Sequence, residues 1–453
     1  AWWLMTVVLV IGWSCAGALE REFYFDRLDN ESGLLQNSIF SLLQTDDGRI
    51  WIGTQGGLHQ FDGYRFKVYE HDGDDPTSLP DSAITALARG ESEQIWVGTA
   101  ANGIARLDTI SGKFDQFALA PDASARNARE AITSLRFDPG RGLWVGSRGG
   151  LGLLDPTTGE RRPFMAESSD AAFGVVDELL ASSDGSVWAA SSSGLWRVAR
   201  GSDHAERIDA DTLAEATSLF EGEDRTLYVG NEDGLHRVDP AIGKSSRIWA
   251  SEGQGPVNSI VEDPSGQLWL AVGGQGLLIF DRRQAGTRWV RPDSSVPGSL
   301  PQAAVTQLMV DRSGLLWVGT DAVGLGKVDP DGAAFNYIAD RDRVPGLDPS
   351  RDQGTFNNIR SILEDRAGNI WLGTDGDGLK RFNRFTASFT HFDKVIAEAF
   401  EMSYPTVLQI ESLAEDADGN IWFACNFGVG SIDPASGKVK VLEQSPIEIT
   451  CRL

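Results

Sequence analysis

Cysteine, histidine and long apolar runs are scarce in this chain, and each shortage excludes a class of protein. Only three cysteines occur in 453 residues, which is too few for the disulfide framework of a small secreted scaffold. Beyond the first twenty residues, no apolar run reaches the length of about 20 residues that a transmembrane helix needs. The five histidines form neither H-x-x-H nor H-E-x-x-H, so the common zinc-binding patterns are missing from the sequence.

Positive charge is also in short supply. The chain has 40 Lys and Arg residues against 65 Asp and Glu residues, which gives a formal net charge of -25. Such an acidic surface repels phosphate backbones and anionic lipids, so we expect no nucleic-acid partner and no peripheral membrane binding. Apolar residues make up 41% of the chain, enough to build the core of a large soluble protein.

The first residues have the composition of an export signal. An apolar or uncharged run from Trp2 to Trp13 is too short to span a bilayer comfortably, and Ala16 to Ala18 form a small-residue site of the A-x-A kind. We expect residues 1–18 to be a signal peptide whose basic beginning is missing. An uncleaved membrane anchor is the alternative. Lipidation at Cys15 is a minor one, because Trp13 occupies a place where a lipobox has a small residue.

What the chain does contain is a repeat, first seen as NSIFSLLQTDDGRIWIGTQGGLHQFD from Asn37 to Asp62. Alternation in its first part, turn residues at Asp46 to Gly48, a β-prone run around Trp51 and a second turn at Gly57 predict three short strands. A central aromatic residue recurs at intervals of 40 to 54 residues: Trp51, Trp96, Trp144, Trp188, Tyr228, Trp269, Trp317, Trp371 and Trp422.

A glycine marks the second turn of every copy, and Leu, Ile or Val follows it. These glycines are Gly57, Gly103, Gly150, Gly194, Gly234, Gly276, Gly324, Gly378 and Gly428. Repeats of this length with strands and no helical period are typical of β-propeller blades. A single blade cannot bury both faces, so the tryptophans are expected to fill the space between adjacent sheets. The sequence therefore predicts an all-β propeller with four-stranded blades.

The number of copies decides the domain organisation. Nine exceeds the usual four to eight blades of one ring, so we expect a seven-bladed ring over residues 19–338 and the first two blades of a second, truncated ring over 357–453. The connection over 339–356 is rich in Asp, Arg, Pro and Gly and is the expected linker. The extra strand at Glu22 to Leu28 precedes the first repeat and is expected to complete the last blade of the first ring.

The repeats also resemble a known family. The run FDRLDNESGLLQNSIFSLLQTDDGRIWIGTQGGLHQFDGYRFKVYEHDGDDPTSLPDSAITAL and the later copies VEDPSGQLWLA, VDRSGLLWVGT, LEDRAGNIWLGT and AEDADGNIWFA are similar to the two-component regulator propellers. The resemblance implies a periplasmic sensor region of a hybrid histidine kinase or diguanylate cyclase. In that family up to fourteen blades precede a small β-sandwich, a membrane helix and a cytoplasmic output module. A membrane connection would then run through a C-terminal helix missing from this sequence, and a homodimer is an arrangement to test.

No motif predicts catalysis, a metal or a cofactor. Asp416, Asp418 and Asn420 look like the start of an EF-hand, but Gly419 falls at the fourth position and no Glu stands at the twelfth, so a plain turn is expected. The glycines of RGGLGLL are not followed by Lys-Ser/Thr, and no G-x-S-x-G occurs. His59 and His236 take equivalent strand positions and are expected to pack between blades.

Ligand binding is instead expected at the loops of one face of the ring. In a propeller, the segments that lead into the first strands and the turns between the second and third strands gather on one face around the central channel. Polar residues at these places are candidates for binding a small polar ligand such as a glycan. They are Asn37, Gln55, Ser82, Asn258, Asp321, Asn358 and Asp375. The alternative is that they satisfy exposed strand ends and bind nothing.

These expectations combine into one functional hypothesis with two rivals. The hypothesis is a periplasmic sensor whose ligand-dependent change reaches a kinase or cyclase through a membrane helix. The rivals are an exported propeller enzyme, either a lyase or a hydrolase, and a passive interaction scaffold.

Overall fold

The structure is a computed structural model that describes residues 23–117, 131–166, 172–210, 212–240, 242–293, 298–331, 358–383, 388–403 and 406–444. These residues fall into two compact units, one within Glu22–Tyr337 and one within Ile338–Leu453. The expected signal peptide over 1–18 and the linker over 339–356 lie outside the described residues. Within the described ranges, no helix has both the length and the apolar character needed to cross a membrane.

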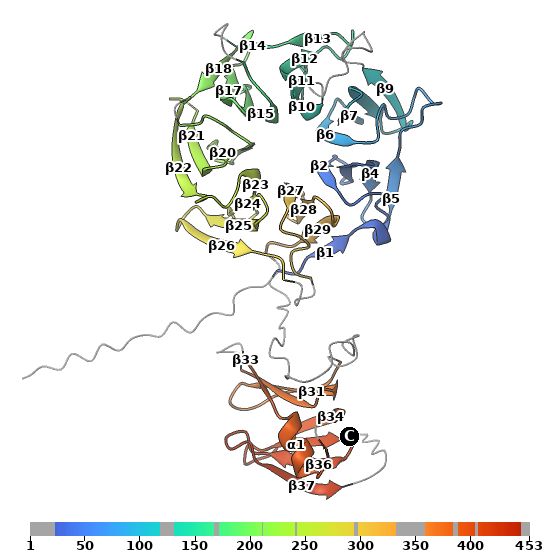
Figure 1. The fold of residues 1–453 in the computed structure, drawn as a ribbon, viewed down its shortest axis with the longest axis vertical. Helices are drawn as coiled ribbons and strands as arrows, with labels where there is room; N and C mark the ends of the chain where they lie inside the picture. The colour runs from blue at the N-terminus through green and yellow to red at the C-terminus, as the bar shows by residue number, and fades with distance from the viewer. Residues whose placement is uncertain are drawn as a thin grey trace, which may run out of the picture. The chain divides into compact units, whose positions relative to one another are not determined.

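The first unit is a ring of seven antiparallel sheets, as the repeat count predicts (Figure 1). Blades 1 to 3 are β2 (Ile39–Gln44), β3 (Ile50–Thr54), β4 (Gly57–Phe61) and β5 (Phe66–Tyr69); β6 (Ile84–Arg89), β7 (Gln94–Thr99), β8 (Ile104–Asp108) and β9 (Lys113–Phe117); and β10 (Ile132–Asp138), β11 (Gly142–Ser147), β12 (Gly150–Leu154) and β13 (Arg161–Pro163). Blade 4 contains β15 (Val176–Ala181), β16 (Val187–Ser191), β17 (Gly194–Val198) and β18 (His204–Ile208), with β14 (Met165–Ala166) added parallel to β18.

The remaining blades of the ring follow the same order. Blade 5 contains β19 (Ser218–Glu221), β20 (Leu227–Asn231), β21 (Gly234–Asp239) and β22 (Lys244–Ala250), and blade 6 contains β23 (Val257–Glu262), β24 (Leu268–Val272), β25 (Gly276–Asp281) and β26 (Gly286–Val290). Blade 7 contains β27 (Val305–Val310), β28 (Leu316–Thr320) and β29 (Leu325–Val328), and its fourth strand is β1 (Asp26–Leu28) from the other end of the unit.

The pairing of β1 with β29 closes the ring and confirms the predicted role of the extra strand. The strand itself is shorter than expected, because only Asp26–Leu28 pairs with β29. Just before it, the Phe25 side chain is 2% exposed and its backbone N–H donates to the Gly298 carbonyl at 2.7 Å. Phe23 packs edge-on against Trp269 of blade 6, with ring centroids 4.9 Å apart. The N-terminal segment therefore fastens blade 7 to blade 6 as well as completing blade 7.

The core lies between blades, where the tryptophans were predicted to lie. The first strands are innermost and contact one another in order around the ring (Figure 1). Trp51 of blade 1 packs with Ile84, Ile95 and Val97 of blade 2. Its indole is 1% exposed. Each blade thus buries its aromatic residue against the next sheet, which is why one blade cannot be stable alone.

An aspartate in the turn after the first strand holds the indole in four of the repeats. In blade 7, the Asp311 carboxylate accepts hydrogen bonds from the backbone N–H groups of Ser313 and Leu315 and from Trp317 Nε1, the last at 2.8 Å. The same contact joins Trp269 to Asp263, Trp371 to Asp365 and Trp422 to Asp416.

The segment from Asp416 to Asn420, whose sequence resembles the start of an EF-hand loop, is one of these turns. The Asp416 carboxylate accepts from Asp418 N, from Asn420 N and Nδ2 and from Trp422 Nε1. These hydrogen bonds, led by those from the Asn420 amide and the Trp422 indole, lower the pKa of Asp416 to about 2. The oxygens that a calcium ion would need are therefore already occupied by the turn's own donors.

The second unit is one curled sheet made of two blades. The first contains β30 (Ile359–Glu364), β31 (Ile370–Gly376), β32 (Leu379–Asn383) and β33 (Ser388–His391), and the second contains β34 (Leu408–Glu415), β35 (Ile421–Cys425), β36 (Gly428–Ile432) and β37 (Val439–Gln444). They join where β31 pairs with β34 through Asp375 and Gln409.

Two helical segments were not anticipated. One is the short 3-10 turn η1 (Asn30–Ser32), and the other is α1 (Asp393–Ala399) between β33 and β34. The spacing of Phe392, Ile396 and Phe400 explains α1, because residues four apart lie on one helical face and all three are buried. Phe392 stacks on Trp371, with ring centroids 5.2 Å apart.

Candidate functional site

The predicted loop face of the ring is present. We use this name for the face that carries the leading segments of the blades and the turns between second and third strands. In blades 2, 3, 4, 6 and 7 a backbone hydrogen bond ties the two together; examples are Ala100 N to Ala83 O at 3.0 Å and Asp321 N to Ala304 O at 3.1 Å. The loop face is therefore a rigid frame around one mouth of the central channel.

A β-bulge near the start of the first strand sets the side chains at this mouth. The register shifts by one residue in six of the seven blades, for example between Ile39 and Ser41 in blade 1. A bulged residue is removed from the strand ladder and its side chain is redirected. We call the bulged residues and their counterpart in blade 5 the inner belt: Phe40, Thr85, Thr133, Asp177, Thr217, Asn258 and Thr306.

Five members of the inner belt bind neighbouring blades to each other. Each donates a side-chain hydrogen bond to a backbone carbonyl in the first strand of the next blade. The pairs are Thr85 with Ile132 at 2.6 Å, Thr133 with Val176, Thr217 with Val257 at 2.7 Å, Asn258 with Val305 at 3.4 Å and Thr306 with Ile39 at 2.6 Å. The hydrogen bonds of these five side chains therefore hold neighbouring blades together.

Phe40 and Asp177 are the two exceptions. Phe40 has no hydrogen-bonding group, and Asp177 makes no hydrogen bond or ion pair with any residue in the described ranges. Both line one cavity of about 510 Å³, together with Thr85, Thr133 and Arg148. The two belt residues that make no hydrogen bond to the next blade therefore line the same cavity at the channel mouth.

The electrostatics of this cavity are mixed. The Asp177 side chain is open to the cavity, yet the protein walls crowd it, and this burial raises the pKa of its carboxyl to about 6, with a further contribution from the Glu215 carboxylate. Arg148 lies on the second turn of blade 3, is exposed and has no ion-pair partner among the described residues. One free anion and one free cation therefore face the same cavity.

A second ionisable pair lies further along the first strands of blades 3 and 4. Arg136 stands opposite Trp144, where the other six blades place an apolar residue: Leu43, Ala88, Leu180, Phe220, Val261 and Met309. Glu178 occupies a place held by serine in four blades: Ser41, Ser134, Ser218 and Ser259.

Glu178 performs the structural task of the serine that it replaces. Its Oε2 accepts a hydrogen bond from Leu219 N at 2.7 Å, just as Ser259 Oγ accepts from Leu308 N at 3.1 Å. Burial raises the pKa of Glu178 to about 7, although the Leu219 N–H and the charge of Arg136 oppose this shift. The ionisable character of blades 3 and 4 is therefore additional to their packing role.

The candidates predicted from sequence do not form one set. Asn258 is the member of that set that lies in the inner belt. Asn37 Oδ1 accepts from Asn30 N at 3.0 Å, and Gln55 accepts from the Gln36 side chain at 3.2 Å, so both serve their own loops. Ser82 and Asp321 lie on the loop face, on blades 2 and 7.

The other two candidates lie in the second unit, next to each other. Asp375 N donates to Asn358 O at 2.9 Å, and the Asp375 carboxylate accepts from Arg360 and Gln409 at 2.8 and 2.7 Å. Binding by any of the seven stays a prediction.

Sequence reasoning missed Phe40, Asp177, Arg148 and the Arg136–Glu178 pair. A signal existed, because aligning the nine repeats on their central aromatic residues places Phe40 and Asp177 where four other copies carry threonine, and places Arg136 where every other copy carries an apolar residue. The predicted packing histidine His59 is fully buried, and its Nε2 accepts from Leu35 N at 3.0 Å. Burial lowers the pKa of His59 to about 4, so the ring nitrogen stays an acceptor at neutral pH.

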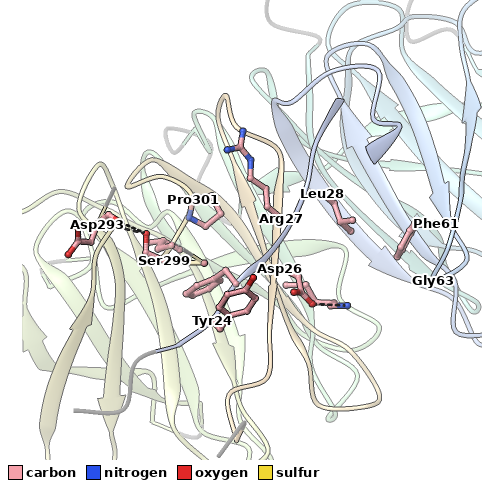
Figure 2. Close-up of a pocket in the computed structure, with 13 residues that line it drawn as sticks. Tyr24, Asp26, Arg27, Leu28, Phe61, Gly63, Asp293, Ser299 and Pro301 are labelled. Carbon is pink, nitrogen blue, oxygen red and sulfur yellow. Dashed lines mark hydrogen bonds and ion pairs between the residues drawn. The ribbon is translucent and has the colours of Figure 1, made fainter. Parts of the chain in front are cut away.

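A larger cavity, of about 660 Å³, lies on the outer rim at the closing strand. Figure 2 shows Tyr24 from the N-terminal segment next to Ser299 and Pro301, whereas the Asp26 carboxylate points away from them. Several polar groups here already have partners within the fold. Asp26 pairs with Lys327 at 3.5 Å, and the Ser299 hydroxyl donates to Asp293 O at 2.7 Å. We therefore favour the channel mouth as the functional site.

Comparison with known proteins identifies the repeats. Residues 33–56, 299–322 and 353–376 match the two component regulator propeller family, which confirms the predicted resemblance. A segment of 62 residues is 37% identical to histidine kinase P4 of Formosa agariphila and covers 14% of this chain and 4% of that protein.

Solved structures share the fold at low sequence identity. The extracellular domain of a hybrid two-component system protein from B. thetaiotaomicron is 19% identical with a TM-score of 0.67, and the match covers 93% of this chain and 55% of that one. Virginiamycin B lyase from Staphylococcus aureus is 15% identical with a TM-score of 0.53, covering 68% of this chain and 99% of that one. The chain thus spans about half the length of the two-component relative.

Proposed function

We propose that this chain, three segments of which match the two component regulator propeller family, is the extracytoplasmic ligand-sensing region of a bacterial transmembrane receptor. The observation that carries the proposal is the cavity at the channel mouth, where the side chains of Asp177 and Arg148 make no hydrogen bond or ion pair with the described residues and the Phe40 ring is only partly buried. Groups that do not serve the fold are available for a ligand. The extracellular two-component relatives support the setting.

The rigidity of the ring indicates how binding would become a signal. The inner belt and the closing strand fix the blades relative to one another, so a ligand at the mouth would act on the ring as a body. Signalling then requires that the ligand bind one arrangement of rings or protomers better than another. The output is a histidine kinase or a diguanylate cyclase reached through a membrane helix.

An enzymatic role is the competing proposal, because lyases share the propeller fold. Within the described residues, the lining of the channel-mouth cavity contains one carboxylate and no histidine, cysteine or lysine. General acid–base chemistry usually needs two positioned proton-transfer groups, and this cavity offers only Asp177. A binding site explains these residues better than a catalytic one.

Saturable binding tests the proposal. The purified chain is screened by thermal shift against neutral oligosaccharides, amino acids, peptides and organic acids, and the hits are titrated by calorimetry. We expect at least one class to bind, and we expect Phe40→Ala to weaken it while Asp203→Asn, on the exposed outer part of blade 4, leaves it unchanged. Failure of every class to bind would overturn direct sensing at this mouth.

The coding sequence beyond Leu453 provides an independent check of the receptor setting. We expect it to continue through further blades into an apolar span and a kinase or cyclase module. A stop codon directly after Leu453 would contradict the receptor proposal and favour a free exported protein.

A further inference from the structure

We propose that the channel-mouth cavity selects a small zwitterion, namely a free amino acid or short peptide with an apolar side chain. Its ammonium group would lie against Asp177, its carboxylate against Arg148 and its side chain toward Phe40. This inference rests on the proposed sensor function and adds the chemical class of the ligand.

The two charges are the first argument. Arg148 is on the second turn of blade 3 and Asp177 is on the first strand of blade 4, so the two come from neighbouring blades and line one cavity. They are not within ion-pair distance of each other, and neither pairs with another described residue. A ligand that carries both charges at a short separation could satisfy both groups at once.

The surroundings of Asp177 favour a cation specifically. The Glu215 carboxylate adds to the negative potential at Asp177, and the next cation along the strands, Arg136, interacts with Glu178 instead. An ammonium group would relieve the repulsion between the two carboxylates. The hydroxyl groups of a neutral glycan could form hydrogen bonds with both side chains, but they would neutralise neither charge, so a zwitterion is the better match.

The apolar part of the cavity is the second argument. Phe40 comes from blade 1, Ala100 from the second turn of blade 2 and Ala131 from the leading segment of blade 3. In five of the other six blades the belt position of Phe40 holds a side chain that bonds the next blade, whereas Phe40 places an aromatic ring there. The Phe40 ring is only partly buried, so part of it is left to contact something inside the channel mouth. An aliphatic or aromatic side chain is the matching partner.

Matched ligands separate these contributions. L-leucine and leucylglycine are titrated into the chain at pH 7.5 by calorimetry, beside N-acetyl-leucine, which lacks the ammonium charge, and leucinamide, which lacks the carboxylate. The twenty amino acids and the neutral disaccharides maltose and cellobiose complete the panel. Comparing leucine with leucylglycine distinguishes a free amino acid from a peptide terminus as the source of the zwitterion.

Matched variants then assign the charges to residues. We expect Asp177→Asn and Arg148→Gln each to weaken binding of the zwitterion at least about tenfold, since each removes one charged hydrogen-bond partner. Asp203→Asn and Arg207→Gln remove exposed charges from the outer side of blade 4 and are expected to change nothing. A cooperative thermal unfolding transition, with a midpoint no lower than that of the unmodified chain, shows that each variant remains folded.

The outcomes distinguish this inference from the proposed function. Binding of the free zwitterions, with loss in both blocked forms and in both channel variants, would support it. Equal binding of blocked and free forms, or binding that is indifferent to Asp177 and Arg148, would overturn it. Binding of only a disaccharide would overturn it while leaving the sensor proposal standing. If no ligand of the panel bound, the result would count against both proposals.

Discussion

Blade 2 lacks the aspartate that holds the indole in blades 6 and 7, and introducing one should stabilise the ring. Gly90 occupies the place of Asp263 and Asp311, six residues before the tryptophan, and its backbone N–H makes the same turn contact, to Gln94 O at 2.9 Å. As a result Trp96 Nε1 is buried without a partner among the described residues. A buried unsatisfied donor destabilises a protein by about 1–3 kcal/mol.

The space around Gly90 reduces the expected gain. A Cβ at this residue would lie 3.0 Å from Gln94 Cβ and 3.1 Å from Trp96 Nε1, so both neighbours must shift by a few tenths of an ångström. The Gly90 backbone does not have a positive φ, so an aspartate meets no backbone strain there. We expect Gly90→Asp to raise the free energy of unfolding by about 1 kcal/mol, once the crowding is subtracted from the new hydrogen bond.

Urea unfolding followed by tryptophan fluorescence measures this change, with the slope of the transition checked for constancy. Gly90→Ala is the matched control, because it introduces the crowding without the acceptor and should destabilise. Asp311→Ala is the reverse experiment and should lower stability by about 3 kcal/mol, since one charged acceptor of several N–H groups is lost. If Gly90→Asp were no more stable than Gly90→Ala, the account of the turn would be refuted.

Three further predictions concern the ring and its channel. Phe25→Ala should lower the free energy of unfolding by about 3–5 kcal/mol, because it empties a buried site beside the closing strand; a loss below about 1 kcal/mol in urea titrations would contradict the role of this segment. The free energy of unfolding should fall as pH rises from about 4 to about 7, because the raised pKa values of Asp177 and Glu178 keep protons on the folded ring that the unfolded chain has released. Glu178→Gln keeps an acceptor for Leu219 N and should flatten a plot of melting temperature against pH. An unaltered slope would refute this. Binding of a cationic group should weaken as pH falls through about 6, where Asp177 becomes protonated beside Glu215 and Arg148, and calorimetry of Asp177→Asn should show no such pH dependence.

The repeat made the fold predictable. Trp51 and its counterparts, each followed by a turn glycine, fix strand positions in every copy, and the strand before the first copy could only be placed in the last blade of a closed ring. The helix α1 was missed because it replaces part of a connection between two repeats. Its apolar spacing of Phe392, Ile396 and Phe400 becomes informative only beside the sheet that it covers.

The site was less predictable than the fold. Whether a polar side chain is available to a ligand depends on whether it is already hydrogen-bonded within the fold, and residue type alone does not show this. Asn37 and Gln55 are as polar as any ligand-binding residue, yet their groups are used by neighbouring loops. Thr85 and Asp177 hold equivalent positions in two blades, and only the structure shows that the first is bonded to the next blade and the second is not. Side-chain hydrogen bonds across blades cannot be read from spacing within one blade.

Hydrogen–deuterium exchange of the chain, with and without the tightest ligand from the binding screen, tests the central claim most directly. We predict that the ligand protects peptides that contain Phe40, the second turn at Arg148 and the start of β15 at Asp177, and leaves the rim around Tyr24 unchanged. Protection confined to the rim, or to the second unit, would contradict a ligand site at the channel mouth.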